Sequence, residues 1–164
     1  MRERMGRRYT VSKRDRRRIL SELSTRYPGL AVSEDSTVEI YEDRELGRIL
    51  IINGVPAFFQ YRDLWLPHLK FLLNNMLPSI PVVVVDSGAV NPLLRGADVM
   101  APGIREIRGE FRAGDPVVVV EESYGKPIVV GIALMDSTSI VSGVVKKGKV
   151  VENVHRIGDK LWSL

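Results

Sequence analysis

Apolar side chains recur with a helical period soon after the start of the chain. Four of them fall on one face of a helix: Ile19, Leu20, Leu23 and Tyr27. Ser12, three residues before Asp15, is typical of a helix start, and Pro28-Gly29 is typical of a helix end. The pattern therefore predicts an amphipathic helix that begins near residue 12 and ends near residue 28.

Alternating apolar and polar positions follow this helix and predict three strands, at residues 37–41, 48–52 and 55–61. Asn53-Gly54 joins the last two strands and is typical of a tight hairpin turn. A short helix is expected at residues 67–76. Its apolar side consists of Trp65, Leu66, Leu69, Leu72, Leu73 and Met76. Prolines then break the pattern, so we expect a domain boundary at residues 78–80.

The second half of the chain is rich in β-branched residues and turn signals. A continuous apolar run at residues 82–85 predicts a buried strand, and residues 87–95 predict a short helix that ends before Gly96. Residues 97–104 are expected to be extended, with an interruption at Pro102-Gly103. Further strands are predicted at residues 116–121, 128–134 and 150–157. Many short strands between turns predict a small closed or half-closed barrel.

Charge is distributed unevenly along the 164 residues, whose net charge is +4. Residues 1–18 hold nine basic and two acidic side chains, a net charge of +7, which leaves −3 on the rest of the chain. Arginine forks match phosphate oxygens, and cation–phosphate contacts release counterions, so such a segment suits a nucleic acid. Charge alone leaves open the alternative of a solvated tail and helix face. The candidate phosphate contacts are Arg14, Arg16, Arg17, Arg18, Lys146 and Lys147.

Several classes of site lack their usual residues. The chain has no cysteine, and its two histidines, His68 and His155, are far apart in the sequence. Disulfides, thiol nucleophiles and most zinc and iron–sulfur sites are therefore excluded. The sequence shows no phosphate-binding Walker loop or dinucleotide fingerprint, so we expect no catalytic residues, no metal and no cofactor. No apolar run approaches the roughly 18 residues of a membrane span, and no secretory signal is recognised, so we expect a cytoplasmic chain without membrane contact.

Four blocks of sequence in the second half stand in a characteristic order. They read V-V-V-V-D-S-G-A-V-N-P-L-L-R-G-A-D-V-M-A-P-G-I (82–104), G-D-P-V (114–117), G-I-A-L-M (131–135) and V-H-R-I-G-D-K-L-W (154–162). Their order and spacing resemble those of a PUA domain, the RNA-binding module named after pseudouridine synthases and archaeosine transglycosylases. The resemblance implies that this half of the chain binds RNA.

The first half resembles the domain that precedes the PUA domain in one group of proteins. The residues that carry this resemblance are R-I-L-I-I-N-G-V-P-A-F-F-Q-Y-R-D (48–63), followed by L-P-H-L-K-F-L-L (66–73). The group comprises small archaeal PUA proteins and the malignant-T-cell-amplified-sequence and ligatin-type translation factors. The expected fold is α+β: a basic segment (1–18), an α/β domain (19–79) and a PUA domain (80–164) that forms a small mixed β-barrel with short helices.

In PUA domains RNA lies along the short helix, the glycine loop after it, the next strand and part of the last strand. The matching positions here are Gly88, Ala89, Asn91, Arg95, Gly96, Ala97, Met100, Gly103, His155 and Arg156. Glycines let a sugar–phosphate chain approach the backbone, and the amides of Gly88, Ala89 and Val90 start a helix, where phosphate is favoured. Alternatives remain open: the glycines serve only as turn residues, Met100 belongs to the core, and His155 is a satisfied edge histidine.

The resemblance implies an RNA-binding protein of translation initiation or recycling. Its expected ligand is structured RNA, either a tRNA acceptor end or ribosomal RNA. The small ribosomal subunit or an initiation-factor-like protein would be a further partner. Two alternatives are an RNA-targeting subunit of an RNA-modification system and a protein-interaction adaptor. The adaptor would dock through the N-terminal domain, with residues 67–76 and 48–61 as candidate surfaces.

Overall fold

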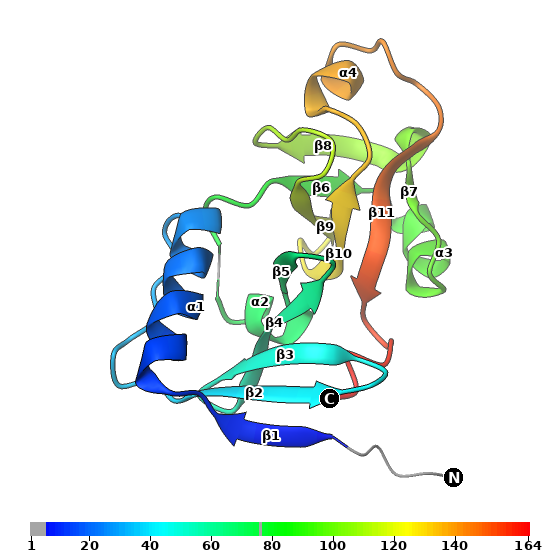
Figure 1. Cartoon of the computed structure of the whole chain (residues 1–164). Helices are drawn as coiled ribbons and strands as arrows, with labels where there is room; N and C mark the ends of the chain where they lie inside the picture. Colours follow the sequence, from blue (N-terminus) through cyan, green and yellow to red (C-terminus); the bar gives the residue numbers. More distant parts are fainter. Residues whose placement is uncertain (1–5, 76) are drawn as a thin grey trace, which may run out of the picture. The chain divides into compact units, whose positions relative to one another are not determined.

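The computed structural model describes residues 6–75 and 77–164 (Figure 1). The chain divides into two compact units. The N-terminal unit extends to Ser79 and includes Leu164, and the C-terminal unit comprises Ile80–Ser163. Each unit has its own sheet.

The sheet of the N-terminal unit has five strands in the order β1-β2-β3-β4-β5, and every pair is antiparallel. The strands are β1 (Arg7–Thr10), β2 (Val38–Asp43), β3 (Gly47–Ile52), β4 (Val55–Tyr61) and β5 (Leu64–Pro67). Asn53 and Gly54 both have positive φ, 50° and 77°, which confirms the predicted tight turn between β3 and β4. The predicted strands at 37–41, 48–52 and 55–61 are confirmed within two residues at each end.

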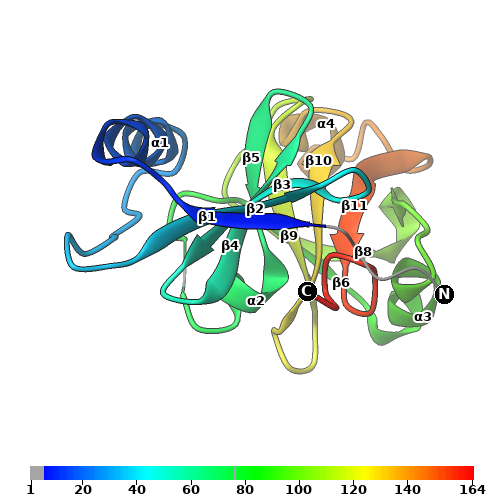
Figure 2. The same cartoon turned by 60° about the horizontal axis from the view of Figure 1, so that its bottom comes forward.

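Strand β1 was not predicted, and it lies at the edge of the sheet beside β2 (Figure 2). Its sequence R-R-Y-T has no apolar alternation, so its pairing with β2 and its ion pairs hold it in place. Arg7 contacts Glu42 at 2.8 Å and Arg8 contacts Glu39 at 2.9 Å. The hydrogen bond from Arg8 lowers the pKa of Glu39. Residues 7–18, which we expected to belong to a separate basic segment, thus form β1 and the start of the following helix.

Helix α1 (Lys13–Arg26) confirms the first predicted element. The hydroxyl of Ser12 caps it by accepting a hydrogen bond from the Asp15 amide at 3.1 Å. Ile19, Leu23 and Tyr27 are buried, as the helical period predicts. Burial raises the pKa of Tyr27, whose hydroxyl donates to the carbonyl oxygen of Trp65 at 2.5 Å.

The second predicted helix is shorter than expected. Helix α2 comprises only Leu69–Leu72, and the ring of His68 caps it by accepting a hydrogen bond from the Lys70 amide. Trp65 and Leu66, which we placed on the helix, belong to β5 instead, because they pair with β4 across a tight turn at Arg62, whose φ is 56°. Met76 lies outside the described residues.

The sheet of the C-terminal unit has six strands in the order β7-β11-β10-β9-β6-β8. The strands are β6 (Val82–Val85), β7 (Val99–Met100), β8 (Ile104–Arg108), β9 (Pro116–Glu121), β10 (Pro127–Ala133) and β11 (Lys149–Arg156). Only β6 and β9 pair in parallel; the other pairs are antiparallel. The mixed sheet curls into a half-barrel (Figure 1), which confirms the expected architecture.

Short helices close this half-barrel: η1 (Ser87–Ala89), α3 (Val90–Leu94), η2 (Ala101–Gly103) and α4 (Ser137–Val141). The predicted helix at 87–95 is therefore η1 followed by α3, and the expected extended segment at 97–104 comprises β7 and η2. Strand β8 and helix α4 were not predicted; the sequence of β8, I-R-E-I-R, is largely charged because β8 is an edge strand that pairs only with β6. The core consists of Val83, Val85, Leu93, Val99, Phe111, Val117, Val119, Ile128, Val129, Ala133, Val150 and Val151.

Candidate nucleic-acid interface

The start of the short helix is built around Asp86. Its carboxylate accepts a hydrogen bond from the Ala89 amide at 3.0 Å, and the Val90 amide donates to the carbonyl oxygen of Ser87. These two amides were predicted to be free for phosphate, and that prediction is wrong, because the turn itself uses them. Gly88 is exposed, and a Cβ there would lie 3.3 Å from the Asp86 carboxylate. The absence of a side chain at Gly88 therefore leaves room for the Asp86 carboxylate that caps this turn.

The glycine loop, residues 95–98, brings two predicted site residues into contact. Gly96 has a φ of 101°, a conformation that side chains rarely adopt. A Cβ at this position would lie 3.2 Å from the guanidinium carbon of Arg156 on β11. The guanidinium therefore lies directly over backbone that carries no side chain. Arg95, the preceding residue, is exposed and adds a second positive charge.

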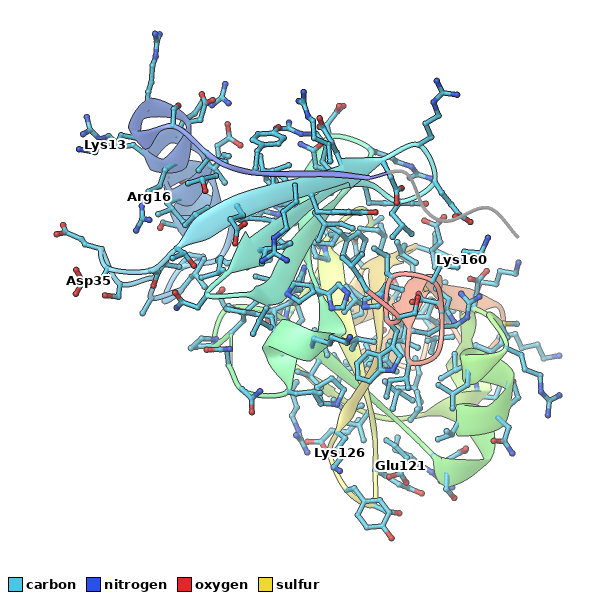
Figure 3. The ribbon with its side chains drawn as sticks, turned by 90° about the horizontal axis from the view of Figure 1, so that it is seen from below. Lys13, Arg16, Asp35, Glu121, Lys126 and Lys160 are labelled. Atoms are coloured by element: carbon cyan, nitrogen blue, oxygen red, sulfur yellow. The ribbon has the colours of Figure 1, made fainter. Side chains whose placement is uncertain are left out.

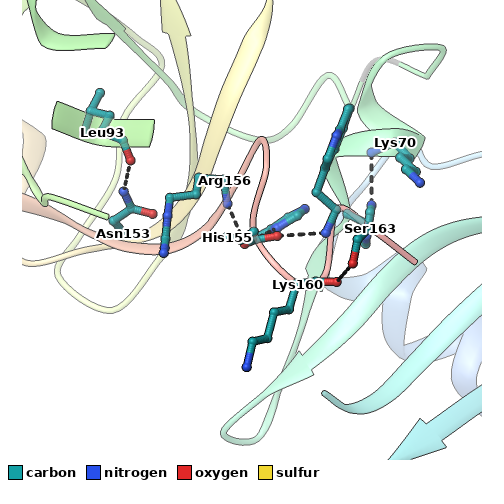
Figure 4. Close-up of polar contacts among 10 residues, drawn as sticks. Lys70, Leu93, Asn153, His155, Arg156, Lys160 and Ser163 are labelled. Atoms are coloured by element: carbon teal, nitrogen blue, oxygen red, sulfur yellow. Dashed lines mark hydrogen bonds and ion pairs between the residues drawn. The ribbon is translucent and has the colours of Figure 1, made fainter. Parts of the chain in front are cut away.

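Asn153 on β11 holds this loop in place. Its side-chain amide donates to the carbonyl oxygen of Leu93 at 2.9 Å (Figure 4) and to that of Ala97 at 2.8 Å. Its backbone amide donates to the carboxylate of Asp98 at 2.9 Å, and the same carboxylate contacts Lys149 at 3.2 Å. We define Asn153 and Asp98 as the loop latch. Neither residue was predicted from the sequence, because their contact joins positions 55 residues apart.

His155 does not reach the surface. Its ring is fully buried, with 0% exposure, and Nδ1 contacts the Asp159 carboxylate at 2.8 Å. The prediction that His155 contacts RNA is therefore wrong for this conformation, and the alternative of a satisfied strand histidine holds. The same carboxylate accepts hydrogen bonds from the backbone amides of Arg156 at 2.9 Å and Trp162 at 2.8 Å. Burial acts to raise the pKa of Asp159, but these hydrogen bonds outweigh it and lower the pKa.

The remaining predicted residues surround the glycine loop or the turn after β7. Met100 is 45% exposed, so its side chain belongs to the surface rather than the core. Gly103 lies next to Ala89: a Cβ on Gly103 would be 3.6 Å from the Cβ of Ala89. Besides Gly88, four of the predicted positions around the loop are exposed: Asn91, Arg95, Ala97 and Met100.

A hollow of about 490 Å³ lies between β8 and the α4 region. Ile104 and Ile140 contribute apolar surface to it, and Lys146 contributes a positive charge. The loop that carries Lys146 and Lys147 is attached to η2, because the Ala101 amide donates to the carbonyl oxygen of Gly148 at 2.9 Å. Both lysines are exposed, as a phosphate contact requires.

Adjacent arginines of α1 have different roles. The guanidinium of Arg16 donates hydrogen bonds to three carbonyl oxygens that precede β2, those of Ser33 at 3.1 Å, Glu34 at 2.9 Å and Ser36. Arg16 therefore holds this segment against α1, which corrects its prediction as a phosphate contact. The other three predicted arginines are exposed: Arg14, Arg17 and Arg18.

Replacing Arg16 by alanine is expected to lower the free energy of unfolding by about 1–2 kcal/mol, because three carbonyl groups lose a charged donor. Arg17→Ala removes the same charge from an exposed position and is expected to change it by less than about 0.5 kcal/mol. Urea denaturation followed by circular dichroism measures both variants. Equal effects of the two substitutions would contradict the structural role of Arg16.

The candidate docking surfaces of the N-terminal unit offer little exposed apolar area. Leu69, Phe71 and Leu72 of α2 are buried. Among the described residues of 48–61 and 67–76, only Val55 and Leu73 are exposed large apolar side chains, at 37% and 47%. The surface proposed for an adaptor is therefore mostly core.

Two further properties concern the described residues alone. No group of three or more histidine, aspartate or glutamate side chains among them could hold a metal ion. No helix in the described ranges is long and apolar enough to cross a membrane.

Two family models match the chain. One is the PUA domain, over residues 81–157, and the other is a domain of unknown function, DUF1947, over residues 7–75. Protein MJ1432 of Methanocaldococcus jannaschii is 39% identical over 158 residues, which cover 95% of each chain. Malignant T-cell-amplified sequence 1-A of Xenopus laevis is 30% identical and covers 89% of this chain and 84% of its own. Translation machinery-associated protein 20 of Saccharomyces cerevisiae is 28% identical, with coverages of 90% and 86%.

Solved structures share the fold over nearly the whole chain. A PUA domain structure from Aeropyrum pernix K1, in complex with tartrate, has a TM-score of 0.84 and 31% identity, and covers 96% of this chain and 89% of its own. A protein from Pyrococcus horikoshii OT3 has a TM-score of 0.81 and 34% identity, with coverages of 96% and 98%. The order of the two units is therefore common to these proteins.

Proposed function

Because the chain belongs to the family of PUA-domain proteins that includes malignant T-cell-amplified sequence 1 and translation machinery-associated protein 20, we propose that it binds structured RNA in translation. The PUA domain and the translation-associated relatives support RNA binding and a translation-related role. The binding surface in this proposal is formed by α3, the glycine loop and the end of β11. Its RNA is a tRNA acceptor end or ribosomal RNA.

The observation that carries the proposal is the contact between Gly96 and Arg156. The Arg156 guanidinium lies 3.2 Å from the point where a Cβ on residue 96 would be. Because residue 96 is a glycine, no side chain at this position covers the guanidinium. A phosphate can therefore reach the guanidinium and the loop backbone together, and Arg95 adds a second charge next to them. The loop latch fixes the glycine loop, and Asp159 holds the backbone of Arg156, so the backbone on both sides loses little conformational entropy on binding.

The apolar part of the surface suits an unstacked base. Met100 is 45% exposed, and Ala97 and Pro102 are exposed on either side of it in the sequence. Protein surfaces that read single-stranded RNA hold splayed bases on apolar or aromatic side chains. Lys146 and Lys147 then serve as auxiliary phosphate contacts from the neighbouring loop.

The proposed role is binding rather than catalysis. The carboxylates beside the turns of the C-terminal unit accept hydrogen bonds from backbone amides: Asp86 from Ala89 at 3.0 Å, Asp115 from Arg112 at 2.9 Å and Asp136 from Ala113 at 2.9 Å. Asp86 and Asp115 thus hold the backbone of their own turns, as aspartates commonly do, and Asp136 holds a segment 23 positions earlier in the chain. No cofactor or metal is required in this proposal.

The proposal places the chain in the cytoplasm with the translation machinery. The small ribosomal subunit or an initiation-factor-like protein would be its further partner. An RNA-targeting role in RNA modification would use the same surface on a different RNA. Sequencing of RNA crosslinked to the chain in cells distinguishes these: enrichment of tRNA acceptor ends or of RNA of the small ribosomal subunit, without guide RNAs, supports the translation role, and enrichment of the guide RNAs of a modification system contradicts it.

Replacing Gly96 by glutamate is expected to weaken RNA binding at least about tenfold, because the new carboxylate neutralises Arg156 and fills the space over the loop. Gly125→Glu is the matched control. Gly125 also has a positive φ, 66°, with nothing within 4 Å of a Cβ, so the same charge is added at another positive-φ glycine that has no cation beside it. Binding of a labelled tRNA acceptor stem with its single-stranded end is measured by fluorescence anisotropy.

Equal affinities of the Gly96→Glu and Gly125→Glu variants would contradict this assignment of the surface. A protein-interaction adaptor would give that result, and it would instead lose a protein partner when the N-terminal unit is altered. Thermal denaturation of both variants, followed by circular dichroism, verifies that each is folded at the temperature of the binding measurement.

A further inference from the structure

One face of helix α1 concentrates positive charge. A hollow of about 560 Å³ on this helix is lined by five residues, which we define as the cationic face: Lys13, Arg14, Arg17, Arg18 and Ser21. All five are exposed. Figure 3 shows Lys13 and Arg16 on α1. The cationic face belongs wholly to the N-terminal unit, whereas Gly96 and Arg156 belong to the C-terminal unit.

The cations of the cationic face differ in their partners from the other arginines of β1, α1 and β3. Arg7, Arg8 and Arg48 form ion pairs with glutamates of β2, and Arg16 donates to three carbonyl oxygens. Within the described part of the chain, no ion pair or hydrogen bond is found for the side chains of Lys13, Arg14 and Arg17. Arg18 has an exposed contact with Asp15 at 3.4 Å. Most of the charge on this face is therefore available to a ligand.

The concentration of positive charge on this face destabilises helix α1. Cations three and four residues apart repel each other, and positive charge in the first turns opposes the helix dipole. The helix forms nevertheless, because Ile19 and Leu23 on its other side are 3% and 1% exposed. An anionic ligand removes the repulsion, so the charges are better explained by binding than by folding.

The lining of the hollow indicates which anion it takes. It contains no aromatic or apolar residue, so it offers nothing on which an unpaired base could stack. From Lys13 to Ser21 the helix rises about 12 Å, enough to follow about three phosphates of one strand. Double-stranded RNA is recognised through phosphates and 2′-hydroxyls, which guanidinium, ammonium and hydroxyl groups contact without reading sequence.

We propose that the cationic face binds the sugar–phosphate backbone of double-helical RNA, independently of its sequence. The inference rests on the proposed function, in which the C-terminal unit holds an unpaired segment of the same RNA. The two contacts together favour RNA that has a paired stem next to a single-stranded end, because the second contact forms at the high effective concentration set by the first.

The test compares two RNA probes: a hairpin with a single-stranded 3′ tail, and the tail alone. The variant Lys13→Ala/Arg14→Ala/Arg17→Ala removes three charges from the cationic face. The matched control Arg44→Ala/Arg112→Ala/Lys126→Ala removes three charges from other exposed positions. Affinities of the full chain are measured by fluorescence anisotropy over a series of salt concentrations.

The unaltered chain is expected to bind the tailed hairpin more tightly than the tail. Its log–log salt dependence should be steeper by about 3, one for each additional cation–phosphate contact. Between about 50 and 200 mM salt this corresponds to about 60-fold more loss of affinity for the hairpin probe. The variant of the cationic face is expected to lose this difference and to keep its affinity for the tail. The control variant is expected to keep the difference between the probes.

The Gly96→Glu variant separates failure of this inference from failure of the proposed function. The inference about α1 is overturned if the variant of the cationic face still binds the hairpin probe more tightly than the tail. It is also overturned if the control variant loses as much affinity for the hairpin probe as the variant of the cationic face. Neither outcome depends on the result for Gly96→Glu. If Gly96→Glu keeps tail binding while the triple variant loses the hairpin gain, the surface on the C-terminal unit is overturned and the one on α1 stands.

Discussion

Replacing Gly131 by alanine is expected to destabilise the chain by about 3 kcal/mol, a large effect for the addition of one methyl group. Gly131 lies in β10 at the point where its register with β11 shifts. A Cβ at this position would collide with the carbonyl oxygen of Glu152 and would lie 2.6 Å from a methyl group of Val151. Because the obstacle is largely backbone, the two strands must separate to admit the methyl group.

Gly103→Ala is the control for this prediction. Neither glycine has a positive φ, and a Cβ on Gly103 would make only an ordinary contact, 3.6 Å from Ala89. The control is expected to change stability by less than about 1 kcal/mol. Urea denaturation followed by fluorescence of Trp162 and Trp65 measures both variants. Similar stabilities would show that β10 and β11 can separate at this bulge without loss.

Elements with their own local signals were predicted from the sequence, and elements formed by pairing were not. Helix α1 has a serine cap and a buried face made of Ile19, Leu23 and Tyr27, all visible in the sequence. Strands β1 and β8 are short, charged and at sheet edges, so their strand conformation depends on partners far away in the sequence. The segment with Trp65 shows the opposite error: its apolar spacing fits a helix, but pairing with β4 makes it a strand.

In the candidate site, too, local features were predicted from the sequence and long-range contacts were not. The resemblance to PUA domains indicated Gly96 and Arg156 separately, but not that the guanidinium of one lies over the backbone of the other, because they are 60 positions apart. Arg16 and Arg17 cannot be distinguished by composition, yet only the first points at carbonyl oxygens of another segment. His155 is buried because β11 turns it toward Asp159, which a single strand pattern does not reveal.

Asparagine in place of Asp159 is expected to lower the free energy of unfolding by about 3 kcal/mol near neutral pH. The two carboxylate oxygens accept hydrogen bonds from the His155 ring and from the amides of Arg156 and Trp162. An asparagine has only one oxygen, so its NH₂ group must face at least one of these donors. The side chain of Asp159 is only 11% exposed, so water does not compensate for the lost acceptor. Because Arg156 is one of the residues held, the variant is also expected to weaken RNA binding.

The pH dependence of this effect follows from the lowered pKa of Asp159. A carboxyl group with a lower pKa in the folded than in the unfolded chain contributes stability that is complete above the unfolded value, about 4, and is lost as pH falls through the folded value. The difference in free energy of unfolding between the original chain and Asp159→Asn should therefore be constant from about pH 5 to neutral pH. It should become smaller as the pH falls below about 4. Asp136→Asn, at an exposed carboxylate with one amide partner, is the control and should cost less than about 1 kcal/mol. A difference that does not shrink in acid would mean that Asp159 acts through its shape rather than its charge.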